Sequence, residues 1–192
     1  MVEEIILPDG SVGVFLSGGS DSAILFWLLA SQGRHDIVLL TACSEDKKYN
    51  IDPAMDVIKW VRDYTDVKVL EHKIVIAPTQ ESRREYRDKA TGELSAKWNL
   101  SCWASGITRN PDEILKHHEQ RKPDRDRVMA RVIHDRFYRP FYAINKSHLA
   151  LLYEKYEINK LHNLTVSCEV SYPPCGDCWW CVEREWAFGN YA

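Results

Sequence analysis

Residues 12–22 read VGVFLSGGSDS, an apolar run that stops abruptly at a cluster of glycines and hydroxyls. The next residues, 23–33, read AILFWLLASQG, which is apolar on nearly every side and ends in glycine. A short apolar run followed by a longer one predicts a buried strand over 12–16 and a buried helix over 21–32, stopped by Gly33. The glycine and hydroxyl cluster therefore fills a turn from a strand into a helix.

The same alternation continues along the chain. Apolar runs at 36–42 and 67–76 predict two further buried strands. Between them, Asp52 followed by Pro53 predicts the start of a helix, with the Asp52 carboxylate as its N-cap. The segment LSCWASG at 100–106 predicts a fourth strand. Strands that alternate with helices of this length indicate right-handed βαβ units, and hence an α/β fold with a parallel, doubly wound sheet covered on both faces.

Two later segments are strongly charged, SRREYRDKATGE at 82–93 and KHHEQRKPDRDR at 116–127. Both are typical of solvated helix or loop. A second interpretation makes the basic residues at 121–127 a lid over an anionic ligand. Beyond them, apolar residues at helical spacing predict a helix over 146–156 that is capped by Asn145.

The composition limits the kinds of protein that this chain can be. Its 192 residues are 45% hydrophobic and 28% charged, which predicts one domain over residues 1–192 with a core of its own. A formal charge of −3 argues against a protein that coats nucleic acid, so no stable nucleic-acid partner is expected. Neither a signal peptide nor a membrane span is visible, and we expect a cytoplasmic protein with no membrane partner.

The cluster at 17–22 has the ingredients of a phosphate site. Gly18 and Gly19 allow the backbone to approach a ligand closely, three serine hydroxyls add donors, and the following helix contributes its N-terminal N–H groups. The cluster also lies at the carboxyl end of a strand, where open parallel sheets bind ligands. The alternative is an ordinary turn in which Asp21 or Ser22 caps the helix.

Four of the six cysteines lie close together in sequence, at Cys168, Cys175, Cys178 and Cys181. Thiolates in Cys-x-x-Cys turns bind zinc tetrahedrally, and four ligands close the shell, which is typical of a structural site. The spacing is also compatible with an iron-sulfur cluster, whereas disulfides do not fit a cytosolic chain. Cys43 and Cys102 lie in apolar runs and are expected to be core residues.

The stretch Ser-Gly-Gly-Ser-Asp-Ser resembles the PP-loop, Ser-Gly-Gly-x-Asp-Ser, of the N-type ATP pyrophosphatases. The resemblance implies an adenine nucleotide alpha hydrolase-like fold (HUP/PP-loop) with a small C-terminal zinc knuckle. It also implies cleavage of ATP to AMP and pyrophosphate while an oxygen of the acceptor is adenylated. Asp21 would lie beside Mg2+-bound phosphates, and pyrophosphate would be cradled by Ser17, Gly18, Gly19, Ser20, Asp21 and Ser22.

The cysteine segment narrows the resemblance to the 7-cyano-7-deazaguanine synthase family. That family's C-terminal zinc motif resembles Cys175-Gly-Asp-Cys178-x-x-Cys181-x-x-Arg184-x-x-Ala187-Phe188, preceded by Thr165-x-Ser167-Cys168. Two upstream segments of the family resemble Arg139-Pro140-Phe141-x-x-Ile144-Asn145-Lys146 and Gly106-x-x-x-Asn110-Pro111-Asp112.

Enzymes of this family use ATP to activate the carboxylate of 7-carboxy-7-deazaguanine, admit ammonia to form an amide, and use a second ATP to form the nitrile. The resemblance therefore implies ATP, Mg2+ and Zn2+ as cofactors, a zinc-binding segment at 165–189 and a homodimer. It implies catalytic roles for Asp21, Ser22, Lys146 and Asp112, and a nucleotide contact at Gly106.

The middle of the chain departs from the family, because Ser44-Glu-Asp-Lys-Lys-Tyr-Asn50 stands in place of a Gly-Gln-Arg-like segment. Two other functions therefore stay open: adenylation of another acceptor, such as a tRNA base or a protein, and a zinc-stabilised ATP-binding module that acts through partner recognition. Single residues keep alternatives too. Without the resemblance, Lys146 would be interpreted as a solvated residue in the first turn of a helix. Arg184 either contacts an anion or caps the zinc knuckle. Trp179 and Trp180 either pack around the metal or stack a base.

Overall fold

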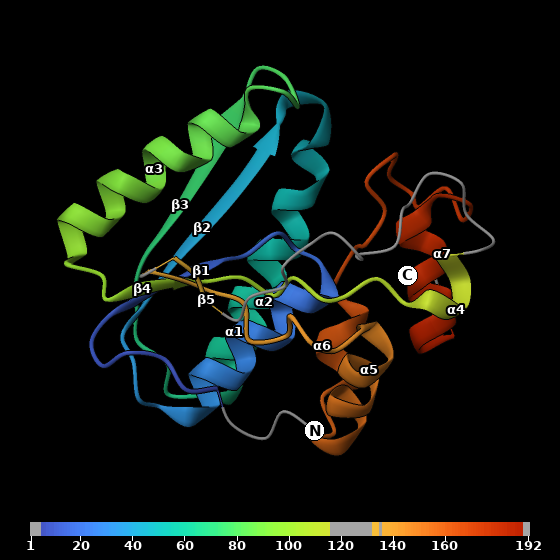
Figure 1. Cartoon of the computed structure of the whole chain (residues 1–192), viewed down its shortest axis with the longest axis horizontal. Coiled ribbons are helices and arrows are strands. Elements are labelled where there is room, and N and C mark those ends of the chain that lie inside the picture. Colours follow the sequence, from blue (N-terminus) through green and yellow to red (C-terminus); the bar gives the residue numbers. More distant parts are fainter. Residues whose placement is uncertain (1–4, 116–131, 135, 190–192) are drawn as a thin grey trace.

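A six-stranded sheet runs through the middle of the molecule in the order β3-β2-β1-β4-β6-β5 (Figure 1). The computed structural model describes residues 5–115, 132–134 and 136–189. The parallel strands are β1 (Val12–Phe15), β2 (Ile37–Ser44), β3 (Val69–Ala77), β4 (Cys102–Ala104) and β6 (Phe137–Tyr138). The short β5 (Val132–His134) runs antiparallel to β6. The predicted parallel sheet is confirmed.

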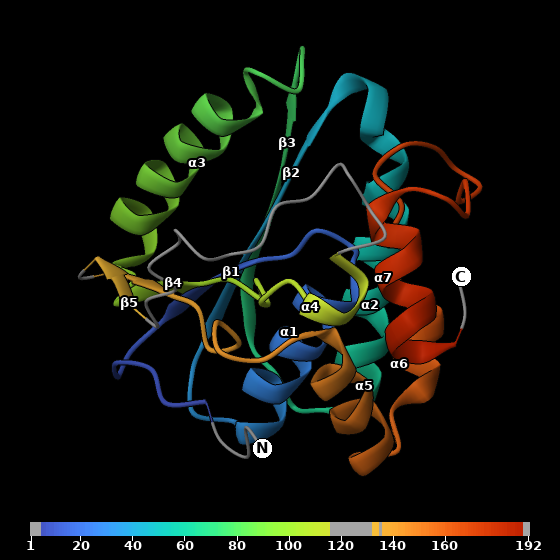
Figure 2. The same cartoon turned by 45° about the vertical axis from the view of Figure 1, so that its right-hand side comes forward.

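Helices cover both faces of this sheet. The helices of the described residues are α1 (Ser20–Gln32), α2 (Ile51–Tyr64), α3 (Arg83–Trp98), α4 (Asp112–Leu115), α5 (Lys146–Lys155), α6 (Asn159–Asn163) and α7 (Trp179–Phe188), with a 3-10 helix η1 (Glu45–Asn50) before α2, and α7 packs against α5. Figures 1 and 2 show α3 on one side of the sheet and α1, α2, α5 and α6 on the other. Each side has its own apolar cluster, so the doubly wound architecture is confirmed.

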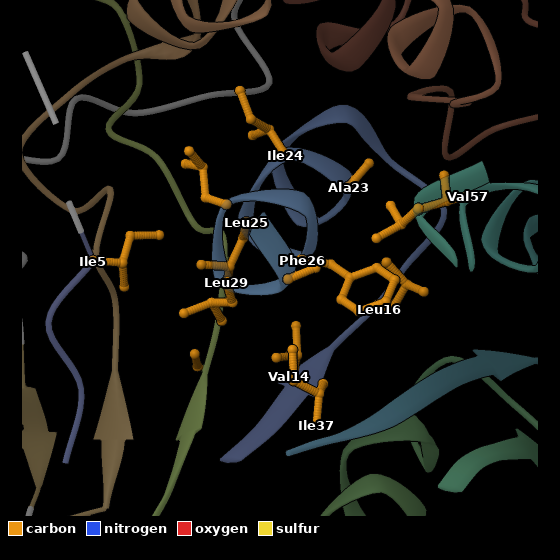
Figure 3. Packing of buried hydrophobic residues seen from close by; sticks show 14 of the residues in the cluster. Ile5, Val14, Leu16, Ala23, Ile24, Leu25, Phe26, Leu29, Ile37 and Val57 are labelled. Carbon is orange, nitrogen blue, oxygen red and sulfur yellow. The ribbon is translucent and has the colours of Figure 1, made fainter. Parts of the chain in front are cut away.

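The larger apolar cluster forms around α1 (Figure 3). Val14 of β1 packs beneath this helix, Val57 approaches from α2, and Ile5 covers another side. Because α1 has neighbours on almost every side, it can be apolar almost all round, and it ends at Gly33 as the sequence predicted. Among the helices in the described part of the chain, none is both long enough and apolar enough to cross a membrane.

The order of the strands identifies one switch point at the edge of the sheet. From β1 the sheet first grows through β2 and β3, and the chain then returns to place β4 on the other side of β1. The carboxyl ends of β1 and β4 therefore flank the point where the direction of winding reverses, which is where open α/β sheets bind ligands. The turn after β1, residues 17–19 (hereafter the glycine-serine loop), and Gly106 after β4 both lie at this edge.

Helix boundaries differ from the sequence prediction by one residue at the start of α1 and at the end of α5, and α2 differs in its N-cap. The helix predicted to be capped by Asp52 begins at Ile51 and has Asn50 as its N-cap, because η1 runs directly into it. The charged segment at 82–93 forms most of α3, which fits the solvated helix that its composition predicted. The charged segment at 116–127, with the lid interpretation of 121–127, lies outside the described residues.

Candidate functional site

The glycine-serine loop is shaped by its own hydroxyls. The Ser17 N–H donates to Ser22 Oγ at 3.1 Å, and the Ser22 hydroxyl donates to the Gly19 carbonyl at 3.0 Å. Gly18 has a positive φ of 79°, and a Cβ there would lie 2.8 Å from the carbonyl oxygen of Asn50. Only glycine combines this backbone conformation with so close an approach, so the residue is fixed by the shape of the turn.

The loop leads straight into the N-terminus of α1. That helix begins at Ser20, and its first intrahelical bond runs from the Ala23 N–H to the Gly19 carbonyl at 3.0 Å. The N–H groups of the first turn before Ala23 have no carbonyl of an earlier turn to bind, and the helix dipole is positive at this end. The geometry of loop and helix suits an anion such as a phosphate.

A buried ammonium lies beside this turn. Lys146, the first residue of α5, has its Nζ 3.3 Å from Asp21 Oδ1 and 2.9 Å from Glu183 Oε2. The side chains of Lys146 and Glu183 are each 6% exposed, whereas that of Asp21 is 24% exposed. We call these three residues the charge cluster. The alternative interpretation of Lys146 as a solvated residue is therefore wrong, because α7 covers it with Glu183.

The charge cluster keeps Lys146 protonated. Burial alone would lower the pKa of Lys146, because a charged ammonium loses its hydration inside the protein. The carboxylates of Asp21 and Glu183 outweigh this effect and raise the pKa above its ordinary value. The side chain therefore carries a positive charge at neutral pH, beside the end of the loop.

The chain after β4 closes the other side of the turn. A Cβ on Gly106 would lie 2.4 Å from the carbonyl oxygen of Asp21, so this position requires glycine for a close backbone approach. Two residues later, the Thr108 hydroxyl donates to Asp21 Oδ2 at 3.2 Å. Asp21 is thus held from one side by Thr108 and from the other by Lys146.

Asp112 is placed differently from the other site residues that the sequence nominated. It begins α4, its side chain is 66% exposed, and its carboxylate accepts a hydrogen bond from Arg109 at 2.8 Å. Figures 1 and 2 both show α4 beside α7. Asp112 is therefore a surface carboxylate on this side of the molecule, and the buried charge opposite Lys146 comes from Glu183.

The four nominated cysteines come together as one cluster. Their sulfur atoms all lie within 4.8 Å of one another. The separations are 3.7 Å from Cys168 to Cys175, 3.9 Å from Cys168 to Cys178, 4.0 Å from Cys175 to Cys181 and 3.5 Å from Cys178 to Cys181. Four thiols around one point are a donor set for a metal ion, and Cys175 is the exposed member. We call this set the cysteine cluster.

Backbone groups support the negative charge of the cysteine cluster. The N–H groups of Val170 and Ser171 each donate to Cys168 Sγ at 3.4 Å. Burial works to raise the pKa of Cys168, but the backbone hydrogen bonds outweigh it and lower the pKa to about 6. A thiolate is the form that binds a metal, so this hydrogen bonding prepares Cys168 as a ligand.

Arg184 is tied inward from α7. It is fully buried and donates to Thr165 Oγ1 at 2.8 Å, Ser167 Oγ at 3.1 Å and the His162 carbonyl at 3.1 Å. These contacts hold the segment before Cys168 against α7, as the capping interpretation of Arg184 expected. Of the two tryptophans after Cys178, Trp179 is buried and Trp180 packs against the cysteine cluster, which favours the packing interpretation of both.

Segment 44–50, which departs from the family pattern, contacts the cysteine segment. Lys47 Nζ lies 3.5 Å from Glu169 Oε2, and the ring of Tyr49 stacks on Tyr172 with centroids 6.1 Å apart. Cys43, just before this segment, is buried in β2, and Cys102 is buried in β4, where burial raises its pKa to about 11. These two thiols lie in the core and stay protonated at neutral pH.

Sequence reasoning missed three residues of this site. Glu183, Thr108 and Tyr153 had no motif to mark them. Tyr153 is buried, and its hydroxyl donates to the Ser20 carbonyl at 2.8 Å, which fixes the first turn of α1. The position of Tyr153 on the apolar face of the helix predicted at 146–156 was a signal for it. A tyrosine at such a position is equally typical of a core residue with no role in a site.

No protein-family profile matches the chain, and no curated protein matches it. Among solved structures, the chain is similar to the U34-tRNA thiolase NcsA from Methanococcus maripaludis with its 4Fe-4S cluster, at a TM-score of 0.53 and 16% identity over 91% of this chain and 63% of the thiolase. It is also similar, at a TM-score of 0.47 and 18% identity, to the NH3-dependent NAD synthetase from Campylobacter jejuni in complex with nitrate, over 79% of this chain and 66% of the synthetase.

This chain spans less than two thirds of the length of either of these two proteins. The likeness to the thiolase shows that the two chains share an α/β fold, as the alternation of strands and helices in the sequence predicted.

Proposed function

We propose that this protein is an ATP-dependent enzyme that adenylates an oxygen of its acceptor and releases pyrophosphate. The observation that carries the proposal is the glycine-serine loop at the carboxyl ends of β1 and β4, with the N-terminus of α1 and the Lys146 ammonium beside it. Backbone and hydroxyl donors of 17–22 hold the pyrophosphate portion of ATP, and Gly106 lets the nucleotide approach the backbone.

Each charged residue has a role in this proposal. Asp21 is the partly exposed carboxylate of the charge cluster and holds Mg2+ beside the phosphates. When bound, Mg2+ neutralises the charge that develops on the departing pyrophosphate. Lys146 adds a fixed positive charge at the same place, and the Ser22 hydroxyl keeps the loop closed.

We propose 7-carboxy-7-deazaguanine and ammonia as the substrates. The support is the cysteine motif with Arg184 and the segment that ends in Lys146, which together resemble the 7-cyano-7-deazaguanine synthase family. A carboxylate is a poor electrophile, and bonding its oxygen to the α-phosphorus of ATP makes AMP the leaving group while pyrophosphate departs. Ammonia then displaces AMP to give the amide, and adenylation of the amide oxygen by a second ATP allows loss of AMP to form the nitrile. Asp112, exposed at the start of α4, lies on the acceptor side in this proposal.

For the cysteine cluster we propose a single zinc ion. Zinc–sulfur bonds of about 2.3 Å in a tetrahedron separate the sulfurs by about 3.8 Å. Four of the six sulfur pairs are 3.5 to 4.0 Å apart and all six are within 4.8 Å, which fits this spacing more closely than that of a larger cluster. In a 4Fe-4S cluster each thiolate binds a different iron, which places the sulfurs further apart. Four protein ligands leave no open position, so the ion would have a structural role.

A second candidate is the adenylation of a base in tRNA. The likeness to the U34-tRNA thiolase with its 4Fe-4S cluster favours it, because four close cysteines occur in this chain too. The sulfur spacing and the net charge of −3 favour the first candidate, since tRNA binding calls for a basic surface.

The two candidates are separated by the products formed. Purified protein is incubated with Mg2+, ammonia and ATP labelled at the α-phosphate, with either 7-carboxy-7-deazaguanine or unmodified tRNA as acceptor. We expect AMP, pyrophosphate and the nitrile with the deazaguanine. AMP formed only with tRNA would support the second candidate, the adenylation of a tRNA base, over the first. ADP formed in place of AMP would contradict both candidates. Elemental analysis tests the metal separately: one zinc per chain is expected, and stoichiometric iron with sulfide would overturn the zinc assignment.

A further inference from the structure

Glu183 is the residue of the charge cluster that no motif marked. It lies on α7, two positions after Cys181, and its side chain is buried. Its carboxylate is nearer to Lys146 than that of Asp21 is, at 2.9 Å against 3.3 Å. One ammonium is therefore shared unequally between two carboxylates, and the more exposed carboxylate holds it less closely.

The shared ammonium leaves a net charge. Two carboxylates and one ammonium sum to one negative charge within the charge cluster, and the buried guanidinium of Arg184, whose charge also interacts with Asp21, offsets it in part. In a partly buried site such charges are weakly screened, so the carboxylate of Glu183 favours the binding of a cation. A cluster of only Asp21 and Lys146 would be neutral, and the ammonium would turn fully toward Asp21. Any divalent cation would then have to displace Lys146 before it could bind the Asp21 carboxylate.

We propose that Glu183 is a positioning residue that holds Lys146 by its second carboxylate contact, so that Asp21 stays available to the Mg2+ that accompanies ATP. The inference rests on the proposed function, because it assigns Mg2+–ATP to the glycine-serine loop. Glu183 acts through Lys146 and Asp21 and touches neither ATP nor the acceptor.

The surroundings of Glu183 fit this role. Its neighbour Arg184 is fixed by three hydrogen bonds to the segment 162–167, and its helix starts within the cysteine cluster, because Cys178 is the N-cap of α7. The carboxylate is therefore carried by a helix that is anchored at both of these places. Lys146 is likewise held at the start of α5, so the pair has little freedom to rearrange when a cation binds.

The test compares Glu183→Gln with wild type in a Mg2+ titration of AMP release. Glutamine keeps the size of the side chain and an oxygen that can accept from Lys146, but it removes the charge. We expect the Mg2+ concentration for half-maximal rate to rise about tenfold, while kcat at saturating Mg2+ falls by less than about threefold. Glu185→Gln, which removes a charge from the same helix, is the matched control and should behave as wild type.

A binding measurement supplies a readout that does not depend on turnover. Mn2+ binding in the presence of a non-hydrolysable ATP analogue, followed by electron paramagnetic resonance, should weaken about tenfold in Glu183→Gln. Glu183→Asp keeps the charge and should bind Mn2+ within about threefold of wild type. A merely structural role would instead lower the melting temperature and kcat of both variants with an unchanged Mg2+ dependence, and that result would overturn the inference.

Failure of the proposed function gives a different pattern. If wild type neither binds Mn2+ with the ATP analogue nor releases AMP with any acceptor, the assignment of ATP to this site is wrong and the role of Glu183 falls with it. If wild type shows both activities and Glu183→Gln matches it in Mg2+ and Mn2+ dependence, only the inference about Glu183 is wrong.

Discussion

The backbone N–H of Val166 donates to the carbonyl of Gly18 at 3.0 Å. This hydrogen bond joins the segment that enters the cysteine cluster to the middle of the glycine-serine loop. Gly18 packs on its other side against Asn50 at the start of α2. The loop is therefore held between two elements, and one of them owes its position to the cysteine cluster and Arg184.

Removal of the metal should weaken nucleotide binding even though the cysteines do not belong to the loop. We expect a chelator to lower the melting temperature and to raise the Kd for a non-hydrolysable ATP analogue about tenfold, because the Val166 anchor of the loop is lost. Calorimetric titration with and without re-added zinc measures this effect. Cys43→Ala removes a buried thiol outside the cluster and should leave metal content unchanged. Unchanged nucleotide affinity after complete metal loss would contradict the coupling.

Asp21→Asn should stop AMP release without unfolding the protein. We expect the rate to fall by at least about 100-fold, because the amide is a poor Mg2+ ligand. The fold should persist because Lys146 keeps its closer carboxylate partner, Glu183. The measurement is AMP release together with the melting temperature, and Asp63→Asn, an exposed carboxylate at the end of α2, is the control. Full turnover by Asp21→Asn would remove Asp21 from the mechanism.

Two glycines should respond oppositely to alanine. In Gly106→Ala the new methyl group meets the Asp21 backbone at 2.4 Å, so the first turn of α1 must shift, and we expect about 2 kcal/mol of destabilisation with loss of ATP binding. In Gly92→Ala the methyl group meets nothing within 4 Å, and this exposed position within α3 should add about 0.5–1 kcal/mol of stability. Chemical denaturation of both variants measures the two effects. A Gly106→Ala variant that is stable and binds ATP would show that the backbone after β4 can move away from Asp21 without harm to the fold or the site.

Stability should fall in mild acid because of His162. Burial, followed by the charges of Arg184 and Lys146, lowers the pKa of His162 to about 3. As the pH falls below the usual histidine pKa of 6.5, His162 becomes protonated in the unfolded chain but stays neutral in the folded chain. The contribution of His162 to the free energy of unfolding is therefore fully present above about pH 6.5 and is lost toward pH 3. We expect a cost of about 1–2 kcal/mol at pH 5.

The control for this prediction is His162→Phe. The imidazole stacks on Phe188 at 3.9 Å, and its Nε2 has no hydrogen-bond partner within the described chain, so a phenyl ring can replace it. Denaturation at pH 7 and pH 5 should show a smaller loss for this variant than for wild type. Equal losses would mean that other groups cause the acid sensitivity.

The sequence predicted those parts of the site that depend on local spacing. Residues 17–22 are continuous in sequence, as a turn that leads into the first turn of α1, so their chemistry could be interpreted before the fold was known. The cysteines are likewise close in sequence, and their clustering follows from two short turns. The strand order was accessible only in outline, because alternation predicts a parallel sheet but does not say that β4 returns beside β1.

The charge cluster was beyond prediction from one sequence because its members meet only through the fold. Glu183 stands in the run Val-Glu-Arg-Glu, which on a short helix reads as a charged surface. Its burial depends on α7 packing against α5, and no periodicity indicates that contact. Asp112 shows the opposite case, since the resemblance nominated it, yet the structure places it at the surface with Arg109.

The dispersed origin of the charge cluster also sets an order for assembly during synthesis. The glycine-serine loop and Asp21 leave the ribosome first, Lys146 follows much later, and Val166 and Glu183 come later still. A nascent chain that already contains β1 to β4 therefore has the glycine-serine loop without Lys146, the Val166 anchor or the second carboxylate. The part of the site made earliest is completed last, because Glu183 reaches Lys146 and Asp21 only after α7 has folded against α5.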